Sequence, residues 1–191
     1  MHSFDWRVED SKHVIQDQWI SLRADTCRMP NGRLVAPYYV LEYPTWVNVV
    51  ALTEQHDVVL VKQYRQGLGK TALELPCGGV EKDDISPYQA IKRELLEETG
   101  YTSDDVIETG RISPNPANHN NIMHCFLARS AKRVASPAFD ETEQIETVLM
   151  PLNTVITLVT AGDIFQALHI SSLFLAIQHL GGLCLSKAIS E

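Results

Sequence analysis

Residues 78–101, GGVEKDDISPYQAIKRELLEETGY, contain a helix with both of its ends marked by local signals. Ser86 is suited to cap the helix, Pro87 to occupy its first position, and Gln89 to complete a capping box. Gly100 is suited to the left-handed position that ends a helix. Every residue between these signals tolerates helix, so we expect a helix that begins at Pro87 and ends just before Gly100.

This helix carries three glutamates on one side. Glu97 follows Glu94 by three residues and Glu98 follows it by four, so their carboxylates share one face of the helix. Arg93 can pair with Glu97 but cannot neutralise all three charges. A solvated acidic face is the common explanation for such a run. The alternative is a divalent cation among the carboxylates, because Mg²⁺ and Mn²⁺ prefer oxygen ligands.

The spacing of these residues resembles the signature of the Nudix hydrolase superfamily. The positions that match it are Gly79, Arg93, Glu94, Leu95, Glu97, Glu98, Gly100 and Tyr101. One position departs, because Ile85 stands where the signature has its first glutamate. Either that position is auxiliary, which we consider the better explanation, or the acidic loop of Glu81, Asp83 and Asp84 replaces it.

The resemblance implies an α/β/α sandwich with a mixed sheet, and strands interleaved with a few helices favour the same α/β class. Nearer the N-terminus, two alternating stretches flank Pro30-Asn31-Gly32 and predict a β-hairpin, with a third strand near Trp6–Ile15. We therefore expect a small antiparallel β element at residues 1–44 and a Nudix domain at residues 45–191. The β element is too small to be stable alone and must pack on the domain or on a second subunit.

Two expectations concern local structure in the domain. Gly78-Gly79 predicts a turn, to which a short strand at Ala72–Pro76 leads. The last helix is expected at Ser172–Leu180. It lies in an apolar run, Leu168–Leu185, whose histidines, glutamine and glycines favour a buried helix over a membrane span.

Net charge, the cysteines and the first residues indicate what kind of protein this is. The net charge of the 191 residues is −8, which argues against nonspecific binding to nucleic acid or membranes. The four cysteines are far apart and form no zinc-like pattern, so we expect reduced thiols in a cytoplasmic protein. The first residues lack the apolar stretch of a signal peptide.

A second resemblance indicates one branch of the superfamily. Val61–Arg65, VKQYR, and Leu73–Gly79, LELPCGG, look like runs in ADP-ribose pyrophosphatases and nucleotide-sugar hydrolases. The resemblance implies hydrolysis of a nucleoside diphosphate linked to a sugar, foremost ADP-ribose, to AMP and ribose 5-phosphate. The Asn-rich loop 115–121 lacks the glycine expected there. Another nucleotide sugar such as GDP-mannose, a dinucleotide, or a non-catalytic nucleotide-sensing module therefore stays an alternative.

The resemblance also implies the metal site. Glu94 and Glu98 would bind Mg²⁺ or Mn²⁺, with Glu97 as a further ligand, and the backbone carbonyl of Cys77 would complete the set. Arg93 would orient the cluster. Arg93 and Glu97 thereby belong to the expected catalytic residues.

The remaining assignments are implied in the same way. Glu141, in a late acidic loop, would be the general base, and Glu143 would contact metal; a solvated loop tip is the alternative. Arg65 would contact the substrate phosphates or the distal sugar, or else form a surface ion pair. Trp19, or less favourably Trp46, would stack on the base, although either could be core. The N-terminal element implies a homodimer.

Overall fold

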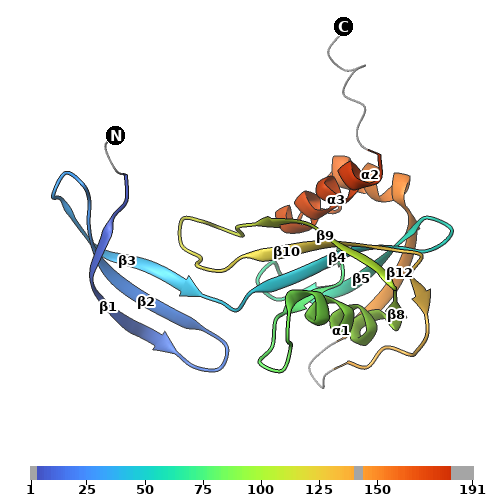
Figure 1. The fold of residues 1–191 in the computed structure, drawn as a ribbon, viewed down its shortest axis with the longest axis horizontal. Helices are drawn as coiled ribbons and strands as arrows, with labels where there is room; N and C mark the ends of the chain where they lie inside the picture. The colour runs from blue at the N-terminus through green and yellow to red at the C-terminus, as the bar shows by residue number, and fades with distance from the viewer. Residues whose placement is uncertain (1–3, 140–143, 182–191) are drawn as a thin grey trace, which may run out of the picture. The chain divides into compact units, whose positions relative to one another are not determined.

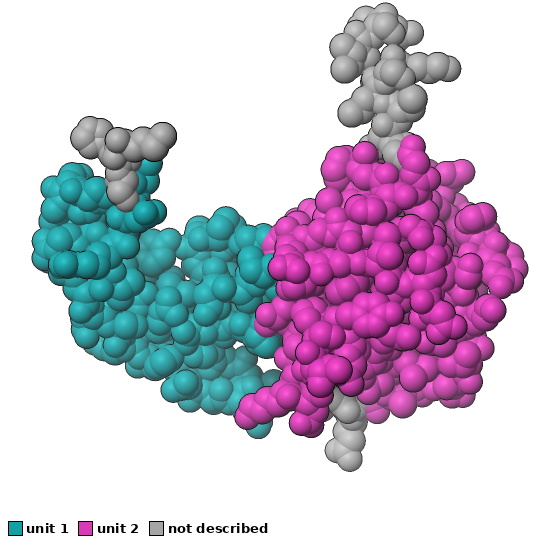
Figure 2. All heavy atoms as spheres, viewed as in Figure 1, with its two compact units in different colours: residues 1–44, 113–122 teal, residues 45–112, 123–191 magenta. Residues whose placement is uncertain are grey.

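The computed structural model describes residues 4–139 and 144–181. The chain divides into two compact units, coloured separately in Figure 2. Unit 1 comprises Met1–Pro44 together with Ser113–Ile122, and unit 2 comprises Thr45–Ile112 together with Met123–Glu191. Each unit is described by itself below.

Unit 1 is built on an antiparallel sheet in the order β1-β2-β3, which confirms the expected N-terminal β element. Its strands are β1 (Arg7–Gln16), β2 (Ser21–Arg28) and β3 (Leu34–Glu42). Gly32 has a φ of 85° in the turn between β2 and β3, a conformation that glycine adopts without strain. The segment 113–122 joins the unit through the backbone N–H of Leu41, which donates to the carbonyl of Asn118 at 2.7 Å.

Unit 2 contains a seven-stranded mixed sheet in which β10 runs parallel to β4 and the other pairs are antiparallel. The main path is β12-β5-β4-β10-β9, with β6 paired to β5 and β7 paired to β4. The strands are β4 (Trp46–Leu52), β5 (Asp57–Arg65), β6 (Lys70–Glu74), β7 (Cys77–Gly79), β9 (Asp105–Ile112), β10 (Met123–Arg129) and β12 (Ile145–Pro151). A separate pair joins β8 (Tyr101–Thr102) to β11 (Lys132–Arg133).

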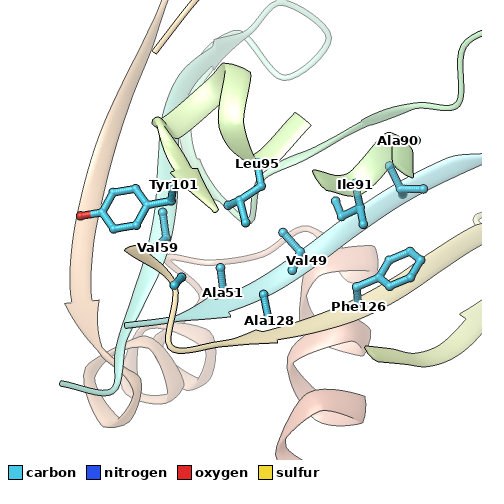
Figure 3. Close-up of a cluster of buried hydrophobic side chains, with 11 residues drawn as sticks. Val49, Ala51, Val59, Ala90, Ile91, Leu95, Tyr101, Phe126 and Ala128 are labelled. Carbon is cyan, nitrogen blue, oxygen red and sulfur yellow. The ribbon is translucent and has the colours of Figure 1, made fainter. Parts of the chain in front are cut away.

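Helices cover both faces of this sheet, as Figure 1 shows, so the expected α/β/α sandwich is confirmed. Helix α1 (Pro87–Thr99) lies on one face, and α2 (Leu152–Ala161) and α3 (Ala167–His179) lie on the other. Figure 3 shows Ile91 and Leu95 of α1 directed towards Val49 of β4 and the neighbouring side chains of β10. Burying these aliphatic groups, each worth about 1.5–3 kcal/mol, fixes α1 against the sheet.

Helix α1 begins and ends where its local signals predict. Ser86 Oγ accepts the backbone N–H of Gln89 at 3.2 Å, and Pro87 occupies the first turn. The Gln89 side chain accepts the backbone N–H of Ile85, at 2.8 Å, rather than that of the capping serine. Gly100 ends the helix in the left-handed region, with a φ of 74°.

Two local expectations differ from the structure. Gly78 and Gly79 form no turn but belong to β7, because their backbone pairs with Val47 and Trp46 of β4. The last helix, α3, begins at Ala167, five residues before the expected Ser172, and ends at His179. No helix in the described part of the chain is both long and apolar enough to cross a membrane.

Gly100 and Gly162 both end a helix in the left-handed region, and they allow a matched test of packing behind α1. A Cβ at Gly100 would lie 2.2 Å from the carbonyl oxygen of Ala135, whereas a Cβ at Gly162 would meet nothing within 4 Å. We expect Gly162→Ala to cost about 1–2 kcal/mol of unfolding free energy from backbone strain alone. Gly100→Ala should cost clearly more, because Ala135 must also move. Chemical denaturation measures both, and equal losses would contradict the packing argument.

Candidate active site

The three glutamates of α1 have different surroundings. Glu98 is 6% exposed, and its Oε2 accepts the backbone N–H of Cys77 at 3.0 Å. Glu97 is more exposed, and its Oε2 accepts Arg93 Nη1 at 3.0 Å. Glu94 is largely buried and also accepts Arg93 Nη1, at 3.0 Å. The three carboxylates on the predicted helix face are therefore held by hydrogen bonds from Arg93 and from the backbone of Cys77.

Strand β7 approaches this face closely at Gly78. A Cβ on Gly78 would lie 2.0 Å from Glu94 Oε1. The Glu94 carboxylate thus occupies the space that a side chain at position 78 would fill, beside the strand whose Cys77 N–H holds Glu98. The backbone of β7 brings Glu94 and Glu98 to one place.

Arg93 links the parts of this cluster. Its Nη2 donates to the carbonyl oxygen of Gly79 at 3.1 Å and to Asp84 Oδ2 at 2.9 Å. The pKa of Arg93 is raised, first by the hydrogen bond to Asp84. A guanidinium with a raised pKa stays charged throughout the pH range of the folded protein, so Arg93 is a permanent cation beside the carboxylates.

Arg65, at the end of β5, is the second arginine near β7. Its Nε donates to Glu74 Oε2 at 3.0 Å, its Nη2 contacts the same oxygen, and the side chain remains 38% exposed. Glu74 is fully buried in β6 and also accepts Gln63 Nε2 at 3.3 Å. Arg65 Nη2 lies 4.0 Å from Cys77 Sγ, which places the guanidinium next to the α1 cluster. Arg65 is therefore in an ion pair, but with a buried carboxylate of the site rather than a surface one.

His169 of α3 supports the strand that carries Glu74. The backbone N–H of Leu75 donates to His169 Nδ1 at 2.7 Å, so the proton of the neutral ring is on Nε2. Potential ligand atoms of His169, Glu74 and Cys77 lie within 4.8 Å of one another. A metal on Nε2 would require the ring to lose its remaining proton, and burial raises the pKa of the Cys77 thiol. With Nδ1 accepting the Leu75 N–H, the neutral His169 ring has no free lone pair for a metal in its present hydrogen bonding.

The other predicted residues fall into three groups. Trp46 lies on β4, paired with Gly79 of β7, and is therefore next to the site. Trp19 belongs to unit 1, where it is 79% exposed. Glu141 and Glu143 lie outside the described residues.

Three residues of the cluster had no assigned role in the sequence analysis. Asp84 was considered only as part of the acidic loop with Glu81 and Asp83. Glu74 was considered only as part of the resemblance at Leu73–Gly79. His169 gave no local signal, because it lies in an apolar stretch and reaches Leu75 across 94 positions of the chain. The sequence signal that could have indicated Glu74 is an acidic residue in one strand with Arg65 at the end of the preceding strand.

Comparison with known proteins identifies the family. A model described as NUDIX domain matches residues 42–168, which is more than half of the chain. The chain belongs to the Nudix family and is a Nudix hydrolase. A second model, described as nucleoside diphosphate sugar hydrolase N-terminal domain, matches residues 6–41.

Relatives of this Nudix hydrolase align over most of its length. The ADP-ribose pyrophosphatase of Bacillus subtilis strain 168 is 29% identical over 168 residues, covering 87% of this chain and 90% of the relative. The methanol dehydrogenase activator of Bacillus methanolicus is 26% identical over 178 residues, 93% of each chain. A crystal structure of an ADP compounds hydrolase matches with a TM-score of 0.81 at 23% identity, over 92% of this chain and 94% of that one. That likeness confirms the fold.

Nudix hydrolases generally need divalent metal ions. The residues of this chain fit such an ion: Glu94 and Glu98 both approach β7, and the glycine at position 78 leaves the room that the Glu94 carboxylate occupies. Carboxylate and carbonyl oxygens are the ligands preferred by Mg²⁺ and Mn²⁺.

The buried His169 makes unfolding depend on pH. Burial lowers the pKa of His169 from 6.5 to about 4, so below pH 6.5 the unfolded chain takes up a proton that the folded protein does not. Stability is therefore lost as pH falls, by about 2 kcal/mol between pH 7 and pH 5. In His169→Asn, whose side chain offers an oxygen to the Leu75 N–H without titrating, this loss should disappear. Denaturant melts at both pH values measure it; an unchanged loss would show that other groups are responsible.

Proposed function

We propose that this Nudix hydrolase is a Mg²⁺-dependent pyrophosphatase of nucleoside diphosphate sugars, with ADP-ribose as its substrate and AMP and ribose 5-phosphate as products. The observation that carries the proposal is the joint presence, around β7, of the Glu94 and Glu98 carboxylates and the Arg65 guanidinium. A cation site beside a fixed arginine suits a doubly charged diphosphate. The relatives and the N-terminal family match point to the same class of substrate.

The first requirement of the reaction is to neutralise the charge of the diphosphate. Glu94, Glu98 and the carbonyl oxygen of Cys77, with Glu97 as a further ligand, would hold the ion, which would neutralise charge on the diphosphate oxygens and lower the pKa of a bound water. Arg93 keeps Glu94 and Glu97 in place by donating to both. We assign metal contact to Glu143 as well, from its place in the sequence.

Arg65 is assigned to the substrate phosphates. Its ion pair with buried Glu74 fixes the guanidinium before substrate arrives, which reduces the entropy lost on binding. The exposed part of the side chain remains available for a phosphate oxygen.

The proton of the attacking water goes to a carboxylate base, for which we propose Glu141. A carboxylate in reach of the water can accept its proton as a general base. The hydroxide formed attacks one phosphorus, the bridging P–O bond breaks, and the leaving phosphate carries away the electron pair.

An aromatic side chain is assigned to the nucleobase. Trp19 is the better candidate, since its ring is exposed in unit 1, while Trp46 is partly buried in β4. Offset stacking on a purine is worth about 1–3 kcal/mol.

Two alternative functions are compatible with the same site. A different nucleotide sugar, such as GDP-mannose, or a dinucleotide would use the same diphosphate contacts and differ at the distal group. A non-catalytic, nucleotide-sensing module is the alternative from another class, and one relative is described as an activator rather than a hydrolase. The intact Arg93, Glu94 and Glu98 cluster favours catalysis.

A substrate panel separates these functions. The protein is incubated with Mg²⁺ and ADP-ribose, nucleotide sugars, dinucleotides or nucleoside triphosphates, and released nucleoside monophosphate is measured by chromatography. ADP-ribose should give AMP with the highest kcat/KM. Faster turnover of GDP-mannose or a dinucleotide would assign that compound as the substrate, and no turnover of any compound would refute the proposed activity and favour the nucleotide-sensing module.

Glu98→Gln tests the metal assignment. The amide oxygen can still accept the Cys77 N–H, so the fold should persist, but the lost charge should lower kcat by at least about 100-fold. Glu146→Gln, an exposed glutamate of β12, is the matched control and should keep its activity. An active Glu98→Gln protein with an unchanged melting curve would refute the assignment of Glu98.

We further propose a cytoplasmic homodimer formed through unit 1. All ten residues of β1 are exposed, and so are several large apolar side chains of this small unit. They include Trp6, Val8, Val14, Ile15, Leu34 and Tyr39. Such a surface on a three-stranded sheet is unfavourable in water and suits a second copy of the chain. The described cysteines are free thiols, consistent with a reducing compartment.

The dimer is tested by light scattering coupled to gel filtration. The wild type should elute with twice the 21.4 kDa mass of one chain. Val8→Asp, which puts a charge on β1, should shift the protein towards the monomer. Val134→Asp, at an exposed valine of unit 2, should not. A monomeric wild type would remove the proposal.

A further inference from the structure

We propose that Asp84 takes the place of the glutamate that the Nudix signature has at position 85. Asp84 would be the positioning residue that fixes Arg93 beside the carboxylates of Glu94 and Glu97. The consequence for catalysis rests on the function proposed above, but the effect on metal binding does not. Sequence alone favoured the view that position 85 is auxiliary; the contacts of the neighbouring residue favour replacement.

Asp84 binds Arg93 along one edge of the guanidinium. Arg93 Nη2 donates to Asp84 Oδ2 at 2.9 Å, and Arg93 Nε lies 3.4 Å from Oδ1. The Asp84 side chain is only 4% exposed, so this ion pair is shielded from solvent. A two-point contact between a carboxylate and a guanidinium sets the plane of the guanidinium as well as its position.

The loop is arranged to direct Asp84 inward and Ile85 outward. Asp84 Oδ2 also accepts the backbone N–H of Glu81 at 2.9 Å, and the Asp84 N–H donates to the Glu81 carbonyl at 3.2 Å. The backbone N–H of Ile85 is bound by the Gln89 side chain, and the Ile85 side chain is 90% exposed. An apolar residue at position 85 is thus tolerated because it does not enter the cluster.

The other edge of Arg93 faces the metal residues. Nη1 donates to Glu94 and to Glu97, each at 3.0 Å, while Nη2 also holds the Gly79 carbonyl. Without Asp84, the guanidinium would be free to turn fully onto Glu94 and compete with a cation for its oxygens. Asp84 therefore protects the ability of Glu94 to bind metal by holding Arg93 from the opposite edge.

The other acidic residues of the loop are less suited to this role. Glu81 approaches Arg93 Nη1 only to 3.6 Å, and its side chain is largely exposed. Asp83 is exposed. Asp83 is therefore the matched control for Asp84: an adjacent aspartate in the same loop.

The test is Mn²⁺ binding without nucleotide, measured from the electron paramagnetic resonance signal of free Mn²⁺. Asp84→Asn keeps an oxygen for the Glu81 N–H but removes the charge facing Arg93. We expect its Kd for Mn²⁺ to rise by at least about 10-fold, the range found when a partner of a metal ligand is removed. Asp83→Asn should bind Mn²⁺ like the wild type. Wild-type affinity in Asp84→Asn, or no Mn²⁺ binding by the wild type, would overturn the proposal.

A second variant separates positioning from simple support of the loop. Asp84→Glu keeps the charge that faces Arg93, so its Mn²⁺ affinity should lie closer to that of the wild type than to that of Asp84→Asn. Melting temperatures are recorded for each protein. An Asp84→Glu protein that is as thermally stable as the wild type but binds Mn²⁺ as weakly as Asp84→Asn would show that Asp84 only supports the loop, and would overturn the proposal.

These measurements also separate a failure of the proposed function from a failure of the positioning role of Asp84. If the substrate panel yields no product while Asp84→Asn still weakens Mn²⁺ binding, the proposed function fails and the positioning role stands. If ADP-ribose is hydrolysed equally by Asp84→Asn and the wild type, with equal Mn²⁺ affinity, the function stands and the positioning role fails.

Discussion

Repulsion among the carboxylates of α1 is the constraint on which the arrangement of the site depends. Glu94, Glu97 and Glu98 lie within five residues of one helix, and like charges at these spacings destabilise it unless they have partners. The chain supplies the partners from different elements: Arg93 for Glu94 and Glu97, and the backbone of β7 for Glu98. The carboxylates are thereby ordered before an ion binds, which is what a preorganised metal site requires.

Rigid elements hold these partners in place. Helix α1 is fixed to the sheet by Ile91 and Leu95, and β7 is fixed by its ladder with β4. At Gly78, the Glu94 carboxylate occupies the space that a side chain at this position of β7 would fill. On the far side of the sheet, His169 of α3 binds the backbone next to Glu74, so the pair formed by Glu74 and Arg65 depends on the second helical layer.

The sequence predicted best what local chemistry decides. The bounds of α1 follow from a serine, a proline and a glycine within a few residues of its ends, and the structure has the helix at Pro87–Thr99. The pair Gly78-Gly79 was misjudged as a turn because its partner strand lies about thirty positions earlier in the chain. The start of α3 was placed too late because its first turn has no capping side chain to mark it. Strand pairing and helix docking are non-local, and propensity does not report them.

The sequence by itself determined the Nudix family, the α/β class and the three carboxylates on one helical face, because these depend on residue types at fixed spacings. Only the tertiary structure decided how those carboxylates are partnered. Asp84 meets Arg93 across a loop, Arg65 meets Glu74 across a strand pair, and His169 reaches Leu75 from another layer. Each contact requires the chain to return to the same point in space, and only the packed core brings it there.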